Sequence, residues 1–344
     1  MTSAEDAVAP EPAARGRQRL RRPGRSRAAY AFVLPLLAIF AAFYAWPALN
    51  TVLSSGFEWG LINPWRLTEP GSWEFVGLGN YSETLGSESF WNAVVNTTIW
   101  LVFFPLLVTG VSLIVSILIW FAGRGLAPLL FRTAFILPMT ISLAAVGVIW
   151  GFIYNPDPDF GLLNAVVGAL DLDFEIDWGP LHLQTGQWLS DLGSLDLGFT
   201  ELRLTNLSLI APAVWAFIGF GVITFTAGLT SVDQDLIDAA RVDGARLRHV
   251  IRYVLIPQLR GSLVIVAVVS VIFALRTFDI VYVLTDGGPG SDTEVLALLL
   301  FKQAFVFLDE PDAGLATTVA VLLSLVLVAG AYPYLRRLLE GTPR

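Results

Sequence analysis

Six long blocks of apolar residues, separated by polar segments, dominate the pattern along this chain. Each block is long enough to cross a bilayer core of about 30 Å, which takes roughly 20 helical residues. Backbone groups in lipid must form hydrogen bonds within their own segment, so we expect each block to be a helix. Core helices of soluble proteins rarely stay apolar on every side over such lengths. The pattern therefore predicts an all-α membrane protein with six transmembrane helices, at Tyr30–Leu53, Ala93–Phe121, Leu129–Tyr154, Leu207–Leu229, Leu263–Leu284 and Leu315–Leu335.

Two of the segments between these blocks have patterns of their own. Residues 155–206 form the longest connection, and apolar and polar residues alternate in its stretches "DLDFEID", "LHLQTGQWL" and "LDLGFTELRL". Alternation of this kind is typical of strands. We therefore expect a small β-rich insertion here, with an irregular loop as the alternative. Farther along, "TDGGPGSDTE" is a dense cluster of turn-forming residues.

The distribution of charge predicts the orientation in the membrane. The chain is 55% hydrophobic and only 15% charged, whereas soluble proteins carry about a quarter charged residues. Seven arginines lie between Arg15 and Arg27, directly before the first block, and cytoplasmic flanks are rich in Lys and Arg. Six spans then place both termini in the cytoplasm and residues 155–206 outside it. Residues 1–28 are expected to be a disordered basic tail, attracted to anionic lipid headgroups.

Residues that commonly carry catalysis or bind metals are scarce. The chain has no cysteine, which excludes disulfides and thiolate metal sites. Its two histidines, His182 and His249, have no ligand partner at helical spacing. The single lysine, Lys302, follows "LLLF", whereas a phosphate-binding loop needs a glycine-rich stretch before Lys-Ser/Thr. Since HExxH, GxSxG and CxxC are missing too, we expect no catalytic residue and no metal site, and ATP would have to be hydrolysed by another chain.

The segment between the fourth and fifth blocks is cationic and contains a glycine hinge. Ser231–Gln234 has the pattern of a capping box, which predicts a helix through "LIDAARV". Asp243 and Gly244 would break this helix, and a second short helix through "RLRHVIRYVLI" would stop before Pro257. The segment is either an interfacial helix that lies on headgroups or a docking element for a cytoplasmic partner. The docking surface would be the small apolar face formed by Leu236, Ala239, Ala240 and Val242.

The same segment resembles the EAA loop of permease subunits in bacterial binding-protein-dependent ABC importers. That loop reads E-A-A, three residues, Gly, nine residues, I-x-L-P. Here Asp238-Ala239-Ala240 is followed after three residues by Gly244 and after nine more by "VLIP", which ends at Pro257. From about residue 30 the chain is also similar to the sugar-importing branch, which includes maltose, alpha-glucoside and glycerol-phosphate permeases; residues 165–205 are the part without a match. The motifs that carry this similarity are "FVGLGNY", "NTTIW", "FRTAFILP", "WGFIYNP", "AGLTSV" and "TFDIVYVLTDGGPG".

The resemblance implies an architecture and a set of partners. Residues 29–344 would be an ABC importer transmembrane domain in a bacterial cytoplasmic membrane, with residues 231–260 as its cytoplasmic coupling loop. Its partners would be a second permease subunit, two ATPase subunits that bind ATP and Mg, and an extracytoplasmic sugar-binding protein; this chain itself would bind neither cofactor nor nucleic acid. Asp238 would face the ATPase, Gly244 would set the turn and Pro257 would end the second helix. The complete coupling set is Asp238, Ala239, Ala240, Asp243, Gly244, Ala245 and Pro257.

The fifth block contains two charged residues, Arg276 and Asp279, and charges within spans are rare and often functional. A spacing of three places them on one helix face, as a structural ion pair or as cavity residues that bond sugar hydroxyls. Nearby rings of Phe273, Phe278 and Tyr282 could stack on sugar rings. Three segments match sugar-contacting segments of the maltose-type relative: "LPMTISL", "AVWAFIGF" and "FALRTFD". This match places eight residues in the substrate pathway: Met139, Leu143, Ala213, Phe217, Phe220, Phe273, Ala274 and Thr277.

Two other classes of function are alternatives to the importer. A stand-alone secondary transporter often has inverted repeats and paired broken helices, and no clear repeat is visible in this sequence. A membrane enzyme would need a catalytic constellation, which the sequence lacks. If the protein worked alone, the basic segment around Gly244 would have no obvious partner.

Overall fold

The computed structural model describes residues 27–340, except for 61–62, 66–73, 124, 173–174, 179–180, 197–200 and 307–311. The described part is mainly helical, with two small antiparallel sheets. The chain divides into two compact units between Asn50 and Thr51, and each is described separately. The predicted disordered tail, residues 1–28, lies outside the described residues except for its last two, which begin α1.

The first unit contains most of one long apolar helix. It consists of α1 (Arg27–Phe40), a π-helical turn at Ala41–Ala45 and the start of α2 (Trp46–Ser54). The helix from Tyr30 to Ser54 is long and apolar enough to cross a membrane. Its apolar side chains are exposed from Tyr30 to Phe40, as expected of a surface that faces lipid or another subunit.

The core of the second unit is formed by α4 (Glu88–Phe121), α8 (Thr205–Thr230) and α12 (Arg260–Leu275). Large buried side chains of this core include Trp100, Phe104 and Phe225. α4 and α8 approach each other so closely that a Cβ atom at Gly221 would collide with Ser112 Oγ. Small residues at such crossings are typical of helix packing in membranes, where close backbone approach replaces the hydrophobic driving force.

Two of the predicted spans are interrupted by sharp breaks. In the third block, α5 (Leu126–Ile136) and a 3₁₀ turn (Leu137–Thr140) are followed by α6 (Leu143–Ile153) at an angle of 106°. Local signals outweigh apolar composition here. Pro138 lies in the 3₁₀ turn, and Ser142 caps α6 by accepting a hydrogen bond from the Ala145 N–H at 3.3 Å.

The fifth block is interrupted as well. α12 ends at Leu275, and α13 (Asp279–Thr285) follows after three residues. Within the described residues, three helices are long and apolar enough to cross a membrane, or up to five segments if each bent pair counts as one span. The number of six spans stays a prediction. The remaining apolar helices are α14 (Leu296–Phe305) and α15 (Ala313–Glu340).

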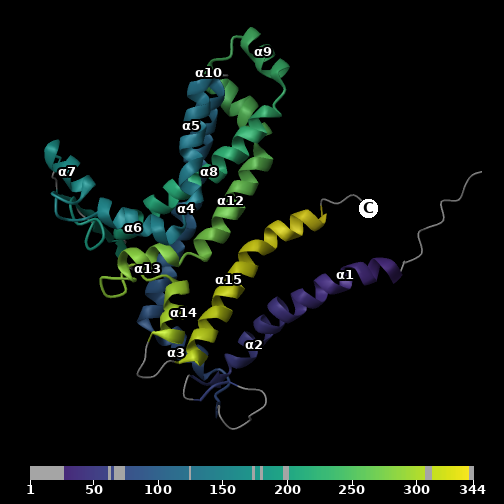
Figure 1. Cartoon of the computed structure of the whole chain (residues 1–344), viewed down its shortest axis with the longest axis vertical. Coiled ribbons are helices and arrows are strands. Elements are labelled where there is room, and N and C mark those ends of the chain that lie inside the picture. Colours follow the sequence, from purple (N-terminus) through teal and green to yellow (C-terminus); the bar gives the residue numbers. More distant parts are fainter. Residues whose placement is uncertain are drawn as a thin grey trace, which may run out of the picture. The chain divides into compact units, whose positions relative to one another are not determined.

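The alternating pattern predicted strands correctly. After α7 (Leu162–Ala169), the chain forms a four-stranded antiparallel meander of β3 (Glu175–Trp178), β4 (Leu181–Gln184), β5 (Gly193–Asp196) and β6 (Glu201–Arg203). A smaller sheet pairs β1 (Phe57–Glu58) with β2 (Glu74–Phe75), and α3 (Gly79–Gly86) follows it. In Figure 1, α9 (Gln234–Val242) and α10 (Leu247–Val250) lie at one end of the second unit, and α3 and α14 lie near the other.

Candidate functional site

The segment predicted to couple to an ATPase begins with a capped helix, but the cap is not the predicted one. The side chain of Asp233, not of Ser231, caps α9, with its Oδ1 accepting the Asp235 N–H at 3.0 Å. Ser231 instead occupies the C-cap position of α8, where its hydroxyl donates to the Gly228 carbonyl at 2.7 Å. The carboxylates of Asp233 and Asp235 both lie at the N-terminus of α9, where negative charge is favourable.

The turn after α9 depends on Gly244. Its φ is +79°, a left-handed conformation that glycine adopts without strain. The Gly244 N–H donates to the Arg241 carbonyl at 3.0 Å, and the Ala245 N–H donates to the Ala240 carbonyl at 2.9 Å. These two bonds form a Schellman motif, which ends a helix and fixes the direction of the following chain. No atom outside the neighbouring residues lies within 4 Å of a Cβ built on Gly244, so the requirement for glycine comes from the backbone angle.

One face of α9 is anchored in an apolar cluster, and the opposite face is open. Ile237 is fully buried, together with Leu229 of α8 and Ile117 of α4. By contrast, Asp238 and Ala239 are exposed. The predicted small apolar face is therefore divided: Ala240 packs inward against the buried cluster, whereas Leu236, Ala239 and Val242 are exposed. Asp243 is also exposed, and Ala245 is half-buried.

Pro257 does not end the second helix, contrary to the sequence prediction. After α10, a π-helical turn (Ile251–Leu255) leads into α11 (Ile256–Gln258), so Pro257 lies inside a helical stretch. Proline cannot donate a backbone hydrogen bond, and its ring crowds the carbonyl four residues earlier. The wider π turn just before Pro257 relieves both problems. The stretch ends at Gln258 and meets α12 at an angle of 71°.

A cavity of about 300 Å³ lies at the break between α12 and α13. Six of the residues predicted for the substrate pathway line it, from α6, α8, α12, the break itself and the start of α13: Leu143, Phe217, Phe273, Arg276, Thr277 and Asp279. The ring of Phe278, which the sequence also suggested, lines it as well, whereas Tyr282 does not. The cavity thus brings together aromatic rings, two opposite charges and a hydroxyl from segments far apart in the sequence.

Four other predicted pathway residues do not line this cavity. Ala213 and Ala274 are buried in the core between the helices. Phe220 is half-buried and packs against the same core, and Met139 is 45% exposed. These four positions follow from motif matching, and nothing in the sequence distinguishes residues that face the cavity from residues that face a neighbouring helix.

The expected relationship between Arg276 and Asp279 is also wrong. Arg276 caps the end of α12 and Asp279 begins α13, so the two do not share one helix face. In the described part of the chain, no ion pair joins them. Between them, Thr277 is 5% exposed, and its Oγ1 has no hydrogen-bond partner. A buried hydroxyl without a partner is unfavourable unless a ligand or water completes it.

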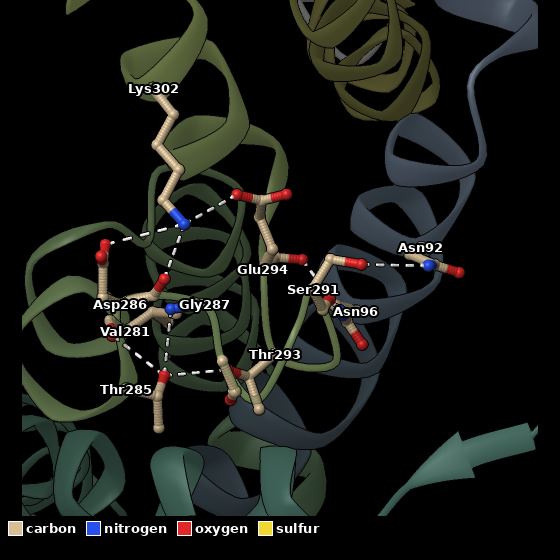
Figure 2. Close-up of polar contacts among 11 residues, drawn as sticks. Asn92, Asn96, Val281, Thr285, Asp286, Gly287, Ser291, Thr293, Glu294 and Lys302 are labelled. Carbon is tan, nitrogen blue, oxygen red and sulfur yellow. Dashed lines mark hydrogen bonds and ion pairs between the residues drawn. The ribbon is translucent and has the colours of Figure 1, made fainter. Parts of the chain in front are cut away.

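A polar network that was not predicted from the sequence surrounds the turn-rich loop between α13 and α14. Figure 2 shows that Lys302 Nζ reaches back to this loop, with the Asp286 carbonyl at 2.7 Å and Glu294 Oε1 at 3.2 Å. Thr285 Oγ1 and Thr293 Oγ1 lie 2.8 Å apart and close the loop. Burial raises the pKa of Glu294, and the ammonium group of Lys302 opposes part of this effect.

Amides from two core helices hold the other side of this loop. The Asn96 side chain of α4 donates to the Glu294 carbonyl at 2.8 Å, and Asn92 donates to Ser291 Oγ at 3.2 Å (Figure 2). Asn96 also accepts a hydrogen bond from Asn206 of α8 at 3.0 Å. Two signals could have revealed the network: polar Asn96 inside an apolar block, and the single lysine close to an acidic turn.

Comparison with known proteins identifies the family. Residues 92–341 match the family model of the binding-protein-dependent transport system inner membrane component. The osmoprotective compounds uptake permease protein GgtC of Synechocystis is 32% identical over 314 residues, which cover 89% of this chain and 97% of that protein. The diacetylchitobiose uptake system permease protein NgcF of Streptomyces coelicolor is 30% identical over 345 residues, covering 96% and 89%.

A solved structure shares the fold. It is that of a bacterial alginate ABC transporter in complex with an alginate pentasaccharide-bound periplasmic protein. A chain of that assembly aligns with a TM-score of 0.65 at 17% identity, over 88% of this chain and 90% of that one. The family match extends over well more than half of the chain, and the relatives cover nearly all of it. The chain belongs to the family of inner membrane components of binding-protein-dependent transport systems.

Proposed function

We propose that this chain is a permease subunit of an ABC importer that moves a sugar or an oligosaccharide into the cell. ATP would be hydrolysed by two separate ATPase subunits, which bind the nucleotide and Mg. The observation that carries the proposal is the unit formed by α9, Gly244 and α10, which is anchored on one face and open on the other. This is the geometry needed by an element that docks into a partner and transmits its motion.

Motion of the docked unit would pass to the core through buried contacts. Ile237 of α9 shares one apolar cluster with Ile117 of α4, Leu229 of α8 and Leu259, which directly precedes α12. Because close-packed side chains transmit displacement without compressing, a shift of α9 would move the three core helices together. Residues 231–260 would thus be the coupling loop on the cytoplasmic side, with both chain termini on that side as well.

The cavity at the α12–α13 break is the proposed passage for the sugar. Phe217 and Phe273 supply apolar ring surface, and Arg276, Asp279 and Thr277 supply hydrogen-bonding groups. Sugars offer both kinds of surface, and polar groups that converge in a mostly apolar pocket are typical of small-molecule sites. A sugar hydroxyl would also provide the partner that Thr277 Oγ1 lacks.

The proposal assigns a place in the membrane and a set of partners. Residues 29–344 would form a six-span transmembrane domain, residues 155–206 would lie outside the cytoplasm, and lipid would cover the exposed apolar faces. A second permease subunit would complete a heterodimer, and an extracytoplasmic binding protein would deliver the sugar. Two observations support these assignments: the family consists of inner membrane components, and the structural relative is bound to a periplasmic protein.

Co-purification with the ATPase subunits tests the proposal. Wild type and Gly244→Pro would be solubilised in detergent from cells that express the whole transporter, captured by a tag, and assayed for bound ATPase activity. Proline cannot adopt a φ of +79° and lacks the N–H that bonds Arg241. We expect at least a tenfold loss of captured ATPase.

Gly261→Ala is the matched control, because Gly261 lies in the first turn of α12 with open space around its Cβ position. It should retain the wild-type amount of ATPase. If wild type brings down no ATPase and the purified protein alone moves a solute across vesicles, the stand-alone transporter takes the place of the importer.

A further inference from the structure

A second cavity, of about 410 Å³, lies apart from the α12–α13 break. One wall is the end of α6 with Tyr154 and Asn155. A second wall is the connection between β4 and β5, which carries Trp188. The third is the end of α13 and the chain that follows it, with Thr285 and Pro289. No residue of this cavity also lines the cavity at Arg276.

The wall that carries Trp188 is held by one buried side chain. Asn164 of α7 donates to the Asn155 carbonyl at 2.9 Å and to the Gly186 carbonyl at 3.1 Å, and its Oδ1 accepts the Trp188 indole N–H at 2.8 Å. Asn164 is only 7% exposed. Three bonds from one buried amide fix the insertion against the end of α6, so the Trp188 ring is held in place before any ligand arrives.

The opposite wall is fixed by the polar network of Figure 2. Thr293 Oγ1 donates to the Gly288 carbonyl at 2.8 Å and lies 2.8 Å from Thr285 Oγ1. Lys302 Nζ holds the Asp286 carbonyl at 2.7 Å. Both walls are therefore preorganised by contacts outside the cavity, which lowers the ordering cost of binding.

The lining combines aromatic and aliphatic side chains with a few polar ones and carries no charged side chain among the described residues. Tyr154 and Trp188 contribute rings that stack on one another, with centroids 6.2 Å apart. Asn155 and Gln187 contribute amides, and Ser190 a hydroxyl. Ring edges and faces suit the apolar faces of pyranoses, and amides suit their hydroxyls. A uronate would bring a carboxylate into a lining that offers no cation to pair with it, which is unfavourable.

We propose that this cavity is a binding site for an uncharged oligosaccharide, separate from the passage at the α12–α13 break. In the proposed orientation it lies on the extracytoplasmic side. This assignment rests on the proposed import of sugars, and it narrows the class of sugar to neutral ones. The volume falls within the range of about 300–1,000 Å³ that is usual for small-molecule sites.

The test is binding of four defined trisaccharides to the purified full-length protein in detergent, by isothermal titration calorimetry and saturation-transfer NMR. The neutral probes are maltotriose, cellotriose and chitotriose, and the acidic probe is trigalacturonate. We expect at least one neutral probe to bind at least tenfold more tightly than trigalacturonate. Trp188→Ala should weaken that binding at least tenfold, and Asn164→Ala, which acts by positioning Trp188, should weaken it while Asn164→Gln restores part of it.

Trp91→Ala is the matched control, because its indole N–H also bonds a nearby carbonyl, that of Leu85 at 2.8 Å, on an exposed part of α4. It should bind like wild type. Gln187→Ala, on the exposed rim of the cavity, replaces Trp188→Ala if that variant does not fold, with an expected loss of about threefold. Three results would overturn the site: no binding of any neutral probe, equal binding of trigalacturonate, or wild-type binding by the rim and Trp188 variants.

The site and the proposed function fail in different ways. If ATP-driven uptake of a neutral sugar by the whole transporter is present and Trp188→Ala leaves binding unchanged, the site is wrong and the importer stands. If neutral probes bind at Trp188 but no ATPase co-purifies and no ATP-driven uptake occurs, the site stands and the importer is wrong.

Discussion

Lys302 Nζ lies 3.2 Å from Glu294 Oε1, and the two side chains are only 14% and 6% exposed. The single lysine of the chain thus pairs with a buried carboxylate at the end of the loop between α13 and α14. The same ammonium group holds the Asp286 carbonyl at the other end of the loop. One side chain therefore joins both ends of a nine-residue turn segment, Asp286–Glu294, whose second half contacts α4 and α8.

Removal of one member of the Lys302–Glu294 pair should lower the stability of the fold. Lys302→Met leaves Glu294 buried without its partner, and we expect a loss of about 2–3 kcal/mol in the free energy of unfolding. The measurement is thermal unfolding of the purified protein in detergent. The double variant Lys302→Met/Glu294→Gln should recover much of the loss, because no unpaired charge remains. Equal stability of wild type and the single variant would contradict the proposed role of the pair.

Stability should also depend on pH through Glu294. Burial raises its pKa in the folded protein above the unfolded value, so the folded state binds more protons between these two values. Its contribution to stability is then fully present below the unfolded pKa and is lost as pH rises through the folded pKa. Melting temperatures of wild type and Glu294→Gln, measured from about pH 4 to pH 7, should diverge, with wild type falling relative to the variant. Parallel curves would show that Glu294 does not titrate in this range.

Replacements of Gly244 should rank by their tolerance of a left-handed backbone. Asparagine adopts this conformation more readily than alanine, and alanine at a φ of +79° costs about 1 kcal/mol. We expect captured ATPase activity to fall in the order Gly244→Asn, Gly244→Ala, Gly244→Pro. Because there is open space around this position, side-chain size should not set the order. An alanine variant that outperforms the asparagine variant would point to a steric role instead.

Thr277→Val separates stability from substrate affinity. The buried Oγ1 has no hydrogen-bond partner among the residues that the structure describes, so its removal should leave the melting temperature unchanged or slightly higher. If a sugar hydroxyl forms a hydrogen bond with Thr277 Oγ1, the KM of the variant for uptake should rise about tenfold. Thr226→Val is the control, because its hydroxyl bonds the Val222 carbonyl within α8. A lower melting temperature with an unchanged KM would assign Thr277 to structure alone.

Much of the fold could be predicted from the sequence, because long apolar blocks and alternating polar positions report directly on helices and strands. The breaks could not be read from composition. Ser142 and Pro138 interrupt the third block through single local hydrogen bonds and one ring, which an average over many residues hides. Composition likewise hides the end of α12 at Leu275, which separates Arg276 from Asp279.

The candidate sites were predicted unevenly. The turn at Gly244 was predictable, since a glycine after a capped helix has a specific backbone role. The cavity at the α12–α13 break was predictable in part, because motif matching finds the segments but not the direction of each side chain. The network of Asn96, Asn206 and Lys302 was not, because its members are about one hundred residues apart and meet only in the folded chain.

In the proposed importer, the exposed face of α9 docks into an ATPase subunit. The chain has no cysteine, so Ala239→Cys introduces a single thiol on that face, to which a benzophenone maleimide can be attached. Ser82→Cys, on an exposed position of α3, is the control. After illumination of membranes that contain the whole transporter, we predict a crosslink to the ATPase from position 239 that changes in yield with ATP, and none from position 82. Absence of a crosslink from position 239, in membranes where ATP-driven uptake is intact, would contradict the account.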